Sequence, residues 1–464
     1  MEKTSRSFIN DFTAGSIPKT LMTFAIPIFL SNLLQVVYNM VDMVVVGQVV
    51  GEAGLSGISV GSDVLHILTF VTMGFSSASQ VIISQYIGAG WRERLSRFIG
   101  TMFTFLLCCG VVMGTLCLLL RNQILGWLNT PAEAWDQAMS YIVTCVCGML
   151  FIVGYNAVSS ILRGMGDSKR PCVFIAIAAA LNLILDLIFV AGFGWEAFGA
   201  ALATVIAQGV SFIISVIYLY RNKERFVFDF ALRSFRIHKI ELLTLVRLGV
   251  PMALRVGSVQ FSKLFVSSWV NDFGVTVSAV FGIGNKLDTI ANLIVEALAT
   301  AGSSMVGQNI GAGKYKRVSR ILGTVLMISC SVFVVIITVT LLFPRFVFGI
   351  FTSEAGVLAV CMEYLPVLIV TFTACALRSS MNSFTHGVGN YKFNFAVAII
   401  DGIIARIGLS LLLGAALGLG YFGFWMGNAI AASTPFFLGG IYYLSGRWKK
   451  KSSLLIEDPE TEKV

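Results

Sequence analysis

The feature that most constrains this chain is a six-residue motif that occurs twice. Residues 85–90 read Gln-Tyr-Ile-Gly-Ala-Gly, and residues 308–313 read Gln-Asn-Ile-Gly-Ala-Gly about 223 positions later. Each copy leads into a basic segment and then into a long apolar run. The same register, with one inserted residue for the last two pairs, matches Ser96 with Ser319, Tyr141 with Tyr364, Gly164 with Gly387, Pro27 with Pro251 and Phe198 with Phe422. A repeat of this length indicates a duplicated domain rather than a solenoid.

The composition places this duplication in a membrane. Hydrophobic residues make up 56% of the chain and charged residues only 12%, which is more apolar surface than one soluble core can bury. Apolar stretches long enough to cross about 30 Å of hydrocarbon recur along the chain. They lie near residues 21–46, 55–84, 98–120, 138–160, 171–193, 198–220, 243–270, 278–306, 321–343, 360–383, 394–414 and 422–445. The sequence therefore predicts an all-α integral membrane protein of about twelve transmembrane helices, in two six-helix bundles related as parallel repeats.

Basic residues predict the orientation of these helices, because Lys and Arg concentrate in short cytoplasmic loops. In this chain they occupy the amino-terminal segment and then every second loop. Examples are Lys19, Arg92, Arg94, Arg97, Arg163, Lys169, Arg170, Lys314, Lys316, Arg317, Arg320 and Lys392. Both termini are expected in the cytoplasm, and both repeats are expected to enter the membrane in the same direction.

The duplication also predicts the domain boundaries. Residues 1–220 are expected to form an amino-terminal six-helix lobe and residues 243–446 a carboxyl-terminal one, with a cytoplasmic tail at 447–464. Residues 221–242 form the cytoplasmic connector, where charged side chains mix with phenylalanines. Such a mixture is typical of an amphipathic helix on the inner membrane surface and also of a solvated loop with a few interfacial aromatics.

The net charge of +9 does not predict a nucleic-acid partner, because the basic residues are spread over the ends of many spans and form no aromatic-interleaved stripe. The nine cysteines lie almost entirely within predicted spans and are interpreted as buried small hydrophobic residues. The chain has no nucleotide-binding Gly-x-x-x-x-Gly-Lys-Ser/Thr loop and no arrangement of nucleophile or metal ligands. An enzyme is therefore not expected, and no cofactor is expected either.

Acidic residues inside the predicted spans are the candidate functional groups. A charge at the centre of a membrane helix costs roughly 2.5–3.5 kcal/mol, so it usually has a function. Asp42 shares a helix face with Gln35 and Asn39, and Asp186 shares one with Asn182. The predicted topology places Asp42, Asp186 and Thr204 at a similar depth. These oxygen-bearing side chains suit a small cation or a transferable proton, and the alternative is a polar network that only locks helices together.

The architecture, the duplicated loops, and residues 39–42 (Asn-Met-Val-Asp) followed by Val46-Gly47 resemble the multidrug and toxic compound extrusion (MATE) family of antiporters. The residues that look like the cation site of its DinF-like branch are Asp42, Asn182, Asp186 and Thr204. Two more, Tyr141 and Asn156, resemble polar residues that line the same lobe. Over roughly residues 15–445, the resemblance implies a V-shaped pair of helix bundles that exports a bulky compound while Na⁺ or H⁺ moves inward. It implies a monomer in the lipid of a bacterial-type cytoplasmic membrane, with a small-molecule substrate and a coupling cation as partners.

The second lobe departs from another branch of that family, which has an acidic residue in the middle of its seventh span. Here residues 261–265 read Phe-Ser-Lys-Leu-Phe, so ion coupling is expected in the first lobe alone. The charged residues at membrane depth are Arg255, Lys263, Lys286, Arg378 and Arg406 against Asp288, Glu296 and Asp401. Some of them are expected to pair, and the candidates for lining the substrate cavity are Lys263, Lys286, Glu296 and Arg378. The basic excess predicts an anionic or zwitterionic substrate.

The sequence-based hypothesis is thus a secondary active antiporter for small amphipathic or drug-like compounds. A lipid-linked oligosaccharide or lipid flippase of the same superfamily is the alternative, because a basic cavity suits a pyrophosphate headgroup. The twelve predicted spans and the Asp42 and Asp186 pair favour the antiporter.

Overall fold

The computed structural model describes residues 10–226 and 228–449, which form helices and loops without a strand. The helices of the first repeat are α1 (Ile17–Val49), α2 (Glu52–Ala89), α3 (Arg92–Trp127), α4 (Trp135–Cys147), α5 (Met149–Gly164), α6 (Lys169–Asp186) and α7 (Glu196–Arg221). Those of the second are α9 (Lys239–Asn271), α10 (Val275–Gly311), α11 (Tyr315–Leu342), α12 (Pro344–Gly349), α13 (Ala355–Val388), α14 (Tyr391–Ile399), α15 (Arg406–Leu411), α16 (Gly420–Ala431) and α17 (Thr434–Leu444). Short π-helical turns at Leu187–Gly192, Ile400–Ala405 and Leu412–Ala416 extend α6, α14 and α15.

The chain divides into two compact units, and the divisions fall inside two long helices. One unit consists of Ile26–Ala253 and the segment that ends at Asp11, and the other consists of Phe12–Ala25 and the chain from Leu254 onward. The first turns of α1 therefore belong to the second unit, and the first half of α9 belongs to the first unit. The division after Ala253 lies inside α9, which begins at the end of the predicted connector 221–242 and continues unbroken to Asn271.

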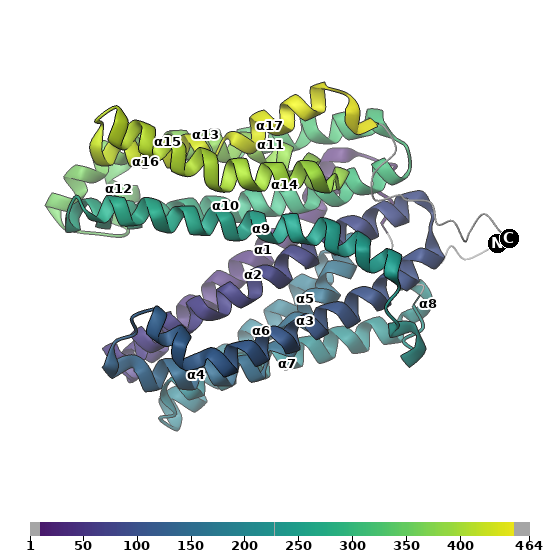
Figure 1. Ribbon diagram of the computed structural model, residues 1–464, viewed down its shortest axis with the longest axis horizontal. Coiled ribbons are helices and arrows are strands. Elements are labelled where there is room, and N and C mark those ends of the chain that lie inside the picture. Colours follow the sequence, from purple (N-terminus) through teal and green to yellow (C-terminus); the bar gives the residue numbers. More distant parts are fainter. Residues whose placement is uncertain (1–9, 227, 450–464) are drawn as a thin grey trace. The chain divides into compact units, whose positions relative to one another are not determined.

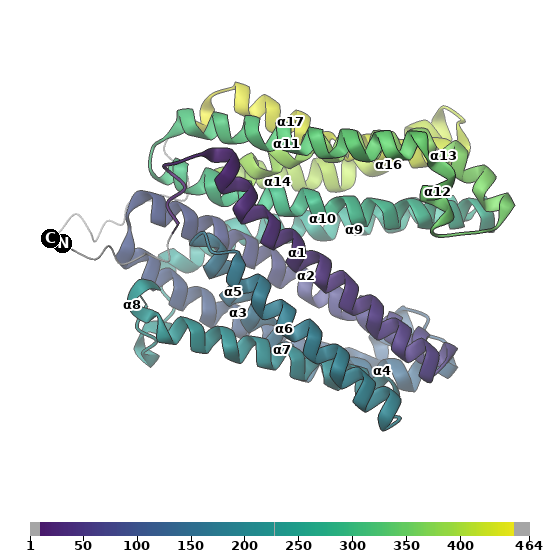
Figure 2. The same ribbon diagram turned by 180° about the vertical axis from the view of Figure 1, so that it is seen from behind.

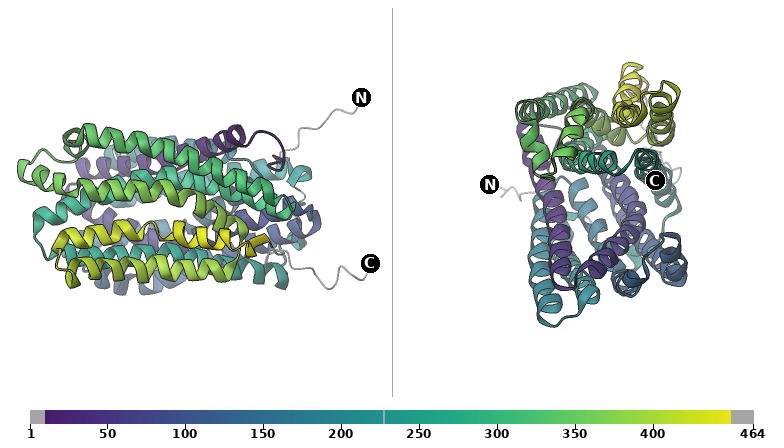
Figure 3. Two further views of the ribbon diagram at one scale, coloured as in Figure 1. Left: turned by 90° about the horizontal axis from the view of Figure 1, so that it is seen from above. Right: turned by 90° about the vertical axis from the view of Figure 1, so that its left-hand side faces the viewer.

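Each unit is a bundle of helices that run along a common direction (Figure 3). In the first unit, α2 packs against α3, α4 and α5, and α7 packs against α4, α5 and α6 (Figure 1). In the second unit, α13 is the central helix and packs against α10, α11, α16 and α17 (Figure 2). This arrangement follows from long apolar helices whose backbone groups are satisfied internally.

The membrane spans agree with the predicted ones in all but two details. In the described part of the chain, ten single helices are long and apolar enough to cross a membrane. The predicted span at 138–160 consists of α4 and α5, which meet at a 50° bend. Gly148 lies at the bend, and a Cβ there would lie 2.4 Å from the Val205 side chain. The predicted span at 422–445 consists of α16 and α17, because Pro435 in the first turn of α17 starts a new helix.

The last glycine of each six-residue motif ends a long helix. Gly90 follows α2 with a φ of 74°, and Gly313 lies just beyond α10 with a φ of 69°. This left-handed conformation is available to glycine at little cost and is common at helix ends. The requirement for this helix stop explains why glycine recurs at this position of both copies.

The second residue of the first motif holds the start of α9. The Tyr86 hydroxyl donates a hydrogen bond of 2.7 Å to Glu241, and Arg94 Nε donates one of 3.0 Å to the other oxygen of the same carboxylate. Glu241 lies in the first turn of α9 and is 3% exposed. The first unit therefore holds the entry to the first helix of the second repeat through a buried ion pair.

The second motif holds the segment that leads into α1. The Phe12 backbone N–H donates to Gln308 Oε1 at 2.9 Å, and Asn309 Nδ2 donates to the Phe12 carbonyl at 3.1 Å. Arg317 donates to the Phe12 and Ala14 carbonyls at 3.1 and 2.6 Å. Each copy of the motif thus anchors the entry to the other repeat, a role that its sequence does not reveal.

The described part of the connector forms no single amphipathic helix. It contains two short helical turns, at Lys223–Phe226 and Leu232–Phe235. Phe228 and Phe235 pack with ring centroids 5.2 Å apart, and the Phe235 carbonyl accepts a hydrogen bond of 2.6 Å from Thr104 of α3. The phenylalanines therefore attach the connector to the first unit, while charged residues of the connector remain exposed.

A glycine and a tyrosine pack against one another in equivalent places of both repeats. A Cβ at Gly61 would lie 2.5 Å from the Tyr141 ring, and a Cβ at Gly284 would lie 2.3 Å from the Tyr364 ring. Both tyrosines are buried, at 5% and 4% exposure. The close approach of α2 to α4, and of α10 to α13, therefore depends on the missing side chain.

We expect Glu241→Ala to lower the free energy of unfolding by about 3–5 kcal/mol, because it leaves Arg94 buried without its carboxylate. Glu93→Ala is the matched control, because its ion pair with Arg97 is exposed and is worth at most about 1 kcal/mol. Reversible unfolding of the purified protein in mixed detergent micelles measures both values. Equal losses in the two variants would contradict the anchoring role of Glu241.

We expect Gly61→Ala and Gly284→Ala each to cost about 1–3 kcal/mol, because a methyl group at either position overlaps a tyrosine ring. Gly126→Ala is the control, since nothing lies within 4 Å of a Cβ at that position of α3. Alanine favours a helix over glycine, so the control should be neutral or more stable by up to about 1 kcal/mol. The same unfolding measurement tests this, and a neutral result at both tyrosine sites would be inconsistent with the packing.

Candidate ion-coupling site

Four polar residues predicted from the sequence meet in the first unit. Asp42 lies on α1, Asn182 and Asp186 lie one turn apart on α6, and Thr204 lies on α7, which packs against α6. The Asp42 and Asp186 carboxyls face each other closely enough to share a hydrogen bond when one of them carries a proton. Asn182 Nδ2 donates to Thr204 Oγ1 at 3.4 Å. The structure therefore brings together side chains from three helices.

These side chains are buried, and they present oxygen atoms without donors. Asp42 is 5% exposed, Asn182 2% and Asp186 0%. In the described part of the chain, no hydrogen-bond donor reaches Asp42 Oδ1, Asn182 Oδ1, either oxygen of Asp186, or Oε1 of the nearby Gln208. No lysine or arginine of that part forms an ion pair with either aspartate. Buried acceptors normally have partners, so these oxygens are available to a bound cation, a proton or water.

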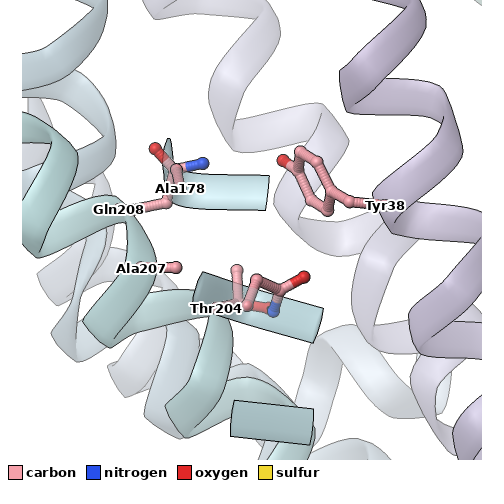
Figure 4. A pocket seen from close by; sticks show the side chains of 6 residues that line it. Tyr38, Ala178, Thr204, Ala207 and Gln208 are labelled. Atoms are coloured by element: carbon pink, nitrogen blue, oxygen red, sulfur yellow. The ribbon is translucent and has the colours of Figure 1, made fainter. Parts of the chain in front are cut away.

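A small pocket adjoins this group. It is lined by Tyr38, Ala178, Asn182, Thr204, Ala207 and Gln208. Figure 4 shows the Tyr38 ring pointing across the pocket towards Gln208, with Thr204 on the same helix as Gln208. The gap between these side chains is too narrow for a bulky compound.

Tyr38 and Gln208 also line the pocket and were not predicted from the sequence, although helical spacing could have indicated both. Tyr38 precedes Asp42 by four residues and Gln208 follows Thr204 by four, so each shares a helix face with a predicted site residue. Neither stood out, because a tyrosine and a glutamine at such positions are common in membrane helices without a functional role.

The supporting residues predicted from the sequence are more scattered. Tyr141 is buried, accepts a 3.5 Å hydrogen bond from Ser62, and lies close enough to Asp42 to interact with it electrostatically. Gln35 and Asn156 are half-buried, and Asn39 is exposed. The structure therefore places Tyr141 beside the site and leaves Asn39 on the surface of α1.

In the second unit, Asp288 lies between two cations. Its carboxylate is 2.7 Å from Lys263 Nζ and 3.9 Å from Arg378 Nη2. Arg378 also donates a hydrogen bond to Asn292. Two of the predicted cavity residues, Lys263 and Arg378, thus share one carboxylate.

Asp401 lies between two further cations. Its carboxylate is 3.8 Å from Arg255 Nη2 and 3.7 Å from Arg406 Nη2. Arg255 also contacts His386 Nε2 at 2.8 Å, and Arg406 donates to Asn428 at 2.8 Å. Asp288 and Asp401 are therefore each compensated by two basic side chains, which fits the sequence-based expectation that some of these charges pair.

The other two predicted cavity residues lie at the surface of α10. Lys286 and Glu296 are exposed. Glu296 is near enough to act electrostatically on Arg255 and Arg378. It forms no ion pair within 4 Å in the described residues.

The chemistry of the first unit suits a hard monovalent cation or a proton. Carboxylate, amide and hydroxyl oxygens are ligands for such ions, and two facing carboxyls can share a proton. Among the described residues, no group of three His, Cys, Asp or Glu side chains could hold a transition metal. The second unit has the opposite character, with cations in excess around its carboxylates.

Comparison with known proteins places the chain in a family. A family model described as MatE matches residues 27–188 and again residues 251–412, once in each repeat. The probable multidrug resistance protein YpnP of Bacillus subtilis is 32% identical over 95% of this chain and 97% of its own length. The multidrug export protein MepA of Staphylococcus aureus is 22% identical over 88% of this chain and 90% of its own length.

Solved structures share the fold. A crystal structure of a MATE protein in the bent conformation superposes with a TM-score of 0.89 over 97% of this chain and 100% of that chain, at 22% identity. An outward-facing MATE family transporter of the MOP superfamily superposes with a TM-score of 0.87 over 96% of this chain and 98% of that chain, also at 22% identity. With one match of the family model in each of its two repeats, the chain belongs to the MATE family of multi-pass membrane transporters.

Proposed function

We propose that the protein is a secondary active antiporter that exports small amphipathic or drug-like compounds while Na⁺ or H⁺ moves inward. It is placed in a bacterial-type cytoplasmic membrane with both termini in the cytoplasm, as the loop charges favour. The names of its relatives, a probable multidrug resistance protein and a multidrug export protein, support export of such compounds rather than lipid flipping.

The observation that carries the proposal is the group of buried oxygen atoms around Asp42 and Asp186. Two carboxylates that face each other among apolar side chains repel one another unless a positive charge lies between them. A cation or a proton removes this repulsion, and its departure restores the repulsion. The free energies of the loaded and empty first unit therefore differ, and such a difference is what coupling to an ion gradient requires.

Asn182, Thr204, Tyr38 and Gln208 complete this ion site in the proposed mechanism. Asn182 and Gln208 supply amide oxygens, and the Asn182 bond to Thr204 uses the amide nitrogen and leaves the amide oxygen available for the ion. Tyr38 closes the pocket on the α1 side. These residues make the first unit the ion-handling lobe, as in the DinF-like branch that the site resembles.

We expect Asp42→Asn and Asp186→Asn each to reduce gradient-driven export to the rate of the passive leak. An amide at either position removes a charge that the coupling ion neutralises, so the gradient no longer changes the free energy of the unit. Asn182→Ala should weaken the apparent ion affinity by about tenfold, the effect of losing one ligand worth about 1.4 kcal/mol. The measurement is dye efflux from proteoliposomes, with Na⁺ and H⁺ gradients imposed separately.

Asp272→Asn is the matched control, because Asp272 is an exposed aspartate in the loop between α9 and α10. It should export at the wild-type rate under the same gradients. The proposal fails if both site variants, reconstituted at normal yield, retain gradient-driven export.

A further inference from the structure

The second unit contains the repeat-related counterpart of the ion site, and its residues have changed. The register of the two repeats shifts by one residue between Gly387 and Phe422. A π-helical turn holds one extra residue in an α-helix, and the turn at Ile400–Ala405 has no counterpart in α6. This turn therefore accounts for the inserted residue, and it also carries Asp401.

With this register, each residue of the ion site has an identifiable counterpart. The match of Pro27 with Pro251 pairs Asp42 with Val266, and the shifted register pairs Asn182 with Arg406, Asp186 with Ser410, and Thr204 with Asn428. Val266 and Ser410 are fully buried. The second unit has thus lost both facing carboxylates at this level and gained a guanidinium.

A hydrogen bond between the equivalent helices supports this register. Asn182 donates to Thr204 at 3.4 Å in the first unit, and Arg406 donates to Asn428 at 2.8 Å in the second. The two bonds join equivalent positions, so Arg406 places its positive charge where the first unit presents an amide. The polarity of the duplicated site is therefore reversed.

Asp288 and Asp401 do not balance the four basic side chains that contact them. Asp288 is shared by two cations and Asp401 by two others. The four basic side chains and two carboxylates together carry a net charge of +2. Adding the more distant Glu296 lowers this net charge to +1. Uncompensated charge at membrane depth is costly, so this excess favours a negatively charged partner.

Lys263 is the most accessible of the four cations. Its side chain is 23% exposed, compared with 13% for Arg255, 10% for Arg378 and 4% for Arg406. The ammonium group has three donors, and Asp288 accepts from one of them. Arg378 Nη2 lies 3.9 Å from the other oxygen of the same carboxylate and adds a second positive charge. An incoming anion can thus reach Lys263 without breaking the pair with Asp288.

We infer that Lys263 and Arg378 form a subsite for a negatively charged group of the exported compound, such as a carboxylate or a phosphate. The second unit accordingly selects anionic or zwitterionic amphipathic cargo, and the first unit handles the cation. This inference rests on the proposed export function, of which it specifies the substrate class.

A matched set of naphthalene compounds tests the subsite. The set consists of 2-naphthylacetate, 2-naphthyl phosphate, 2-naphthylethylammonium and the neutral 2-naphthylethanol, so the ring is constant and the charge changes. Equilibrium dialysis of the purified full-length protein gives their affinities. We expect wild-type protein to bind at least one of the two anions about tenfold more tightly than the alcohol, and the ammonium compound more weakly than the alcohol.

Lys263→Gln should remove most of that preference, about tenfold in anion affinity, and leave the affinity for the alcohol unchanged. Lys263→Arg should restore it, because it keeps the charge. Lys392→Gln is the matched control, an exposed lysine of α14 in the same unit, and it should bind like wild type. If Lys263→Gln folds poorly, the double variant Lys263→Gln/Asp288→Asn can be used, because it removes both charges of the ion pair. The double variant should also lose the anion preference.

The outcomes separate this inference from the proposed function. The subsite is refuted if wild-type protein binds the ammonium compound as well as the anions, or if Lys263→Gln and the double variant keep the anion preference. Gradient-driven export of the neutral alcohol that Asp42→Asn abolishes would support the antiporter independently of the subsite. Anion-selective binding without export of any member under either gradient would support the subsite and refute the antiporter.

Discussion

Charge at membrane depth has to be compensated, because removing it from water costs far more than any single packing contact returns. In the first unit the Asp42 and Asp186 carboxyls face each other, and no basic side chain of the described residues pairs with them. The second unit places Asp288 and Asp401 each between two cations. The first arrangement needs a mobile positive charge, and the second has a surplus of fixed positive charges. The two repeats therefore share a helical framework but differ in the sign of the charge that each can bind.

The helical framework that positions these charges depends on the entries to α1 and α9. In the first unit Glu241 accepts hydrogen bonds from Tyr86 and Arg94. In the second unit the Phe12 backbone is hydrogen-bonded to Gln308 and Asn309. Both anchors are buried and hydrogen-bonded, so the polar groups of two chain entries are satisfied within apolar surroundings. Because α1 carries Asp42 and α9 carries Lys263, the same anchored helices supply a charged residue to each site.

Helical periodicity predicted most residues of the candidate ion site but not Tyr38 and Gln208. Asn182 and Asp186 share a face by spacing alone, and the intramembrane carboxylate of Asp42 is conspicuous in an apolar helix. Tyr38 and Gln208 became recognisable only when α1 and α7 were seen to line one pocket. Asn39 shares the predicted face with Asp42 and is exposed, because spacing fixes the face of one helix and says nothing about what covers it.

The sequence by itself determined the membrane class, the duplication and nearly all of the helices, because these depend on apolar length and on a repeat that is visible in one dimension. It could not show that α4 and α5 bend at Gly148 or that Pro435 starts a separate helix, since breaks of this kind depend on local packing. Only the tertiary structure paired the charges of the second unit. Lys263 and Asp288 are far apart in the chain, and whether two such groups meet is decided by helix packing and not by residue type.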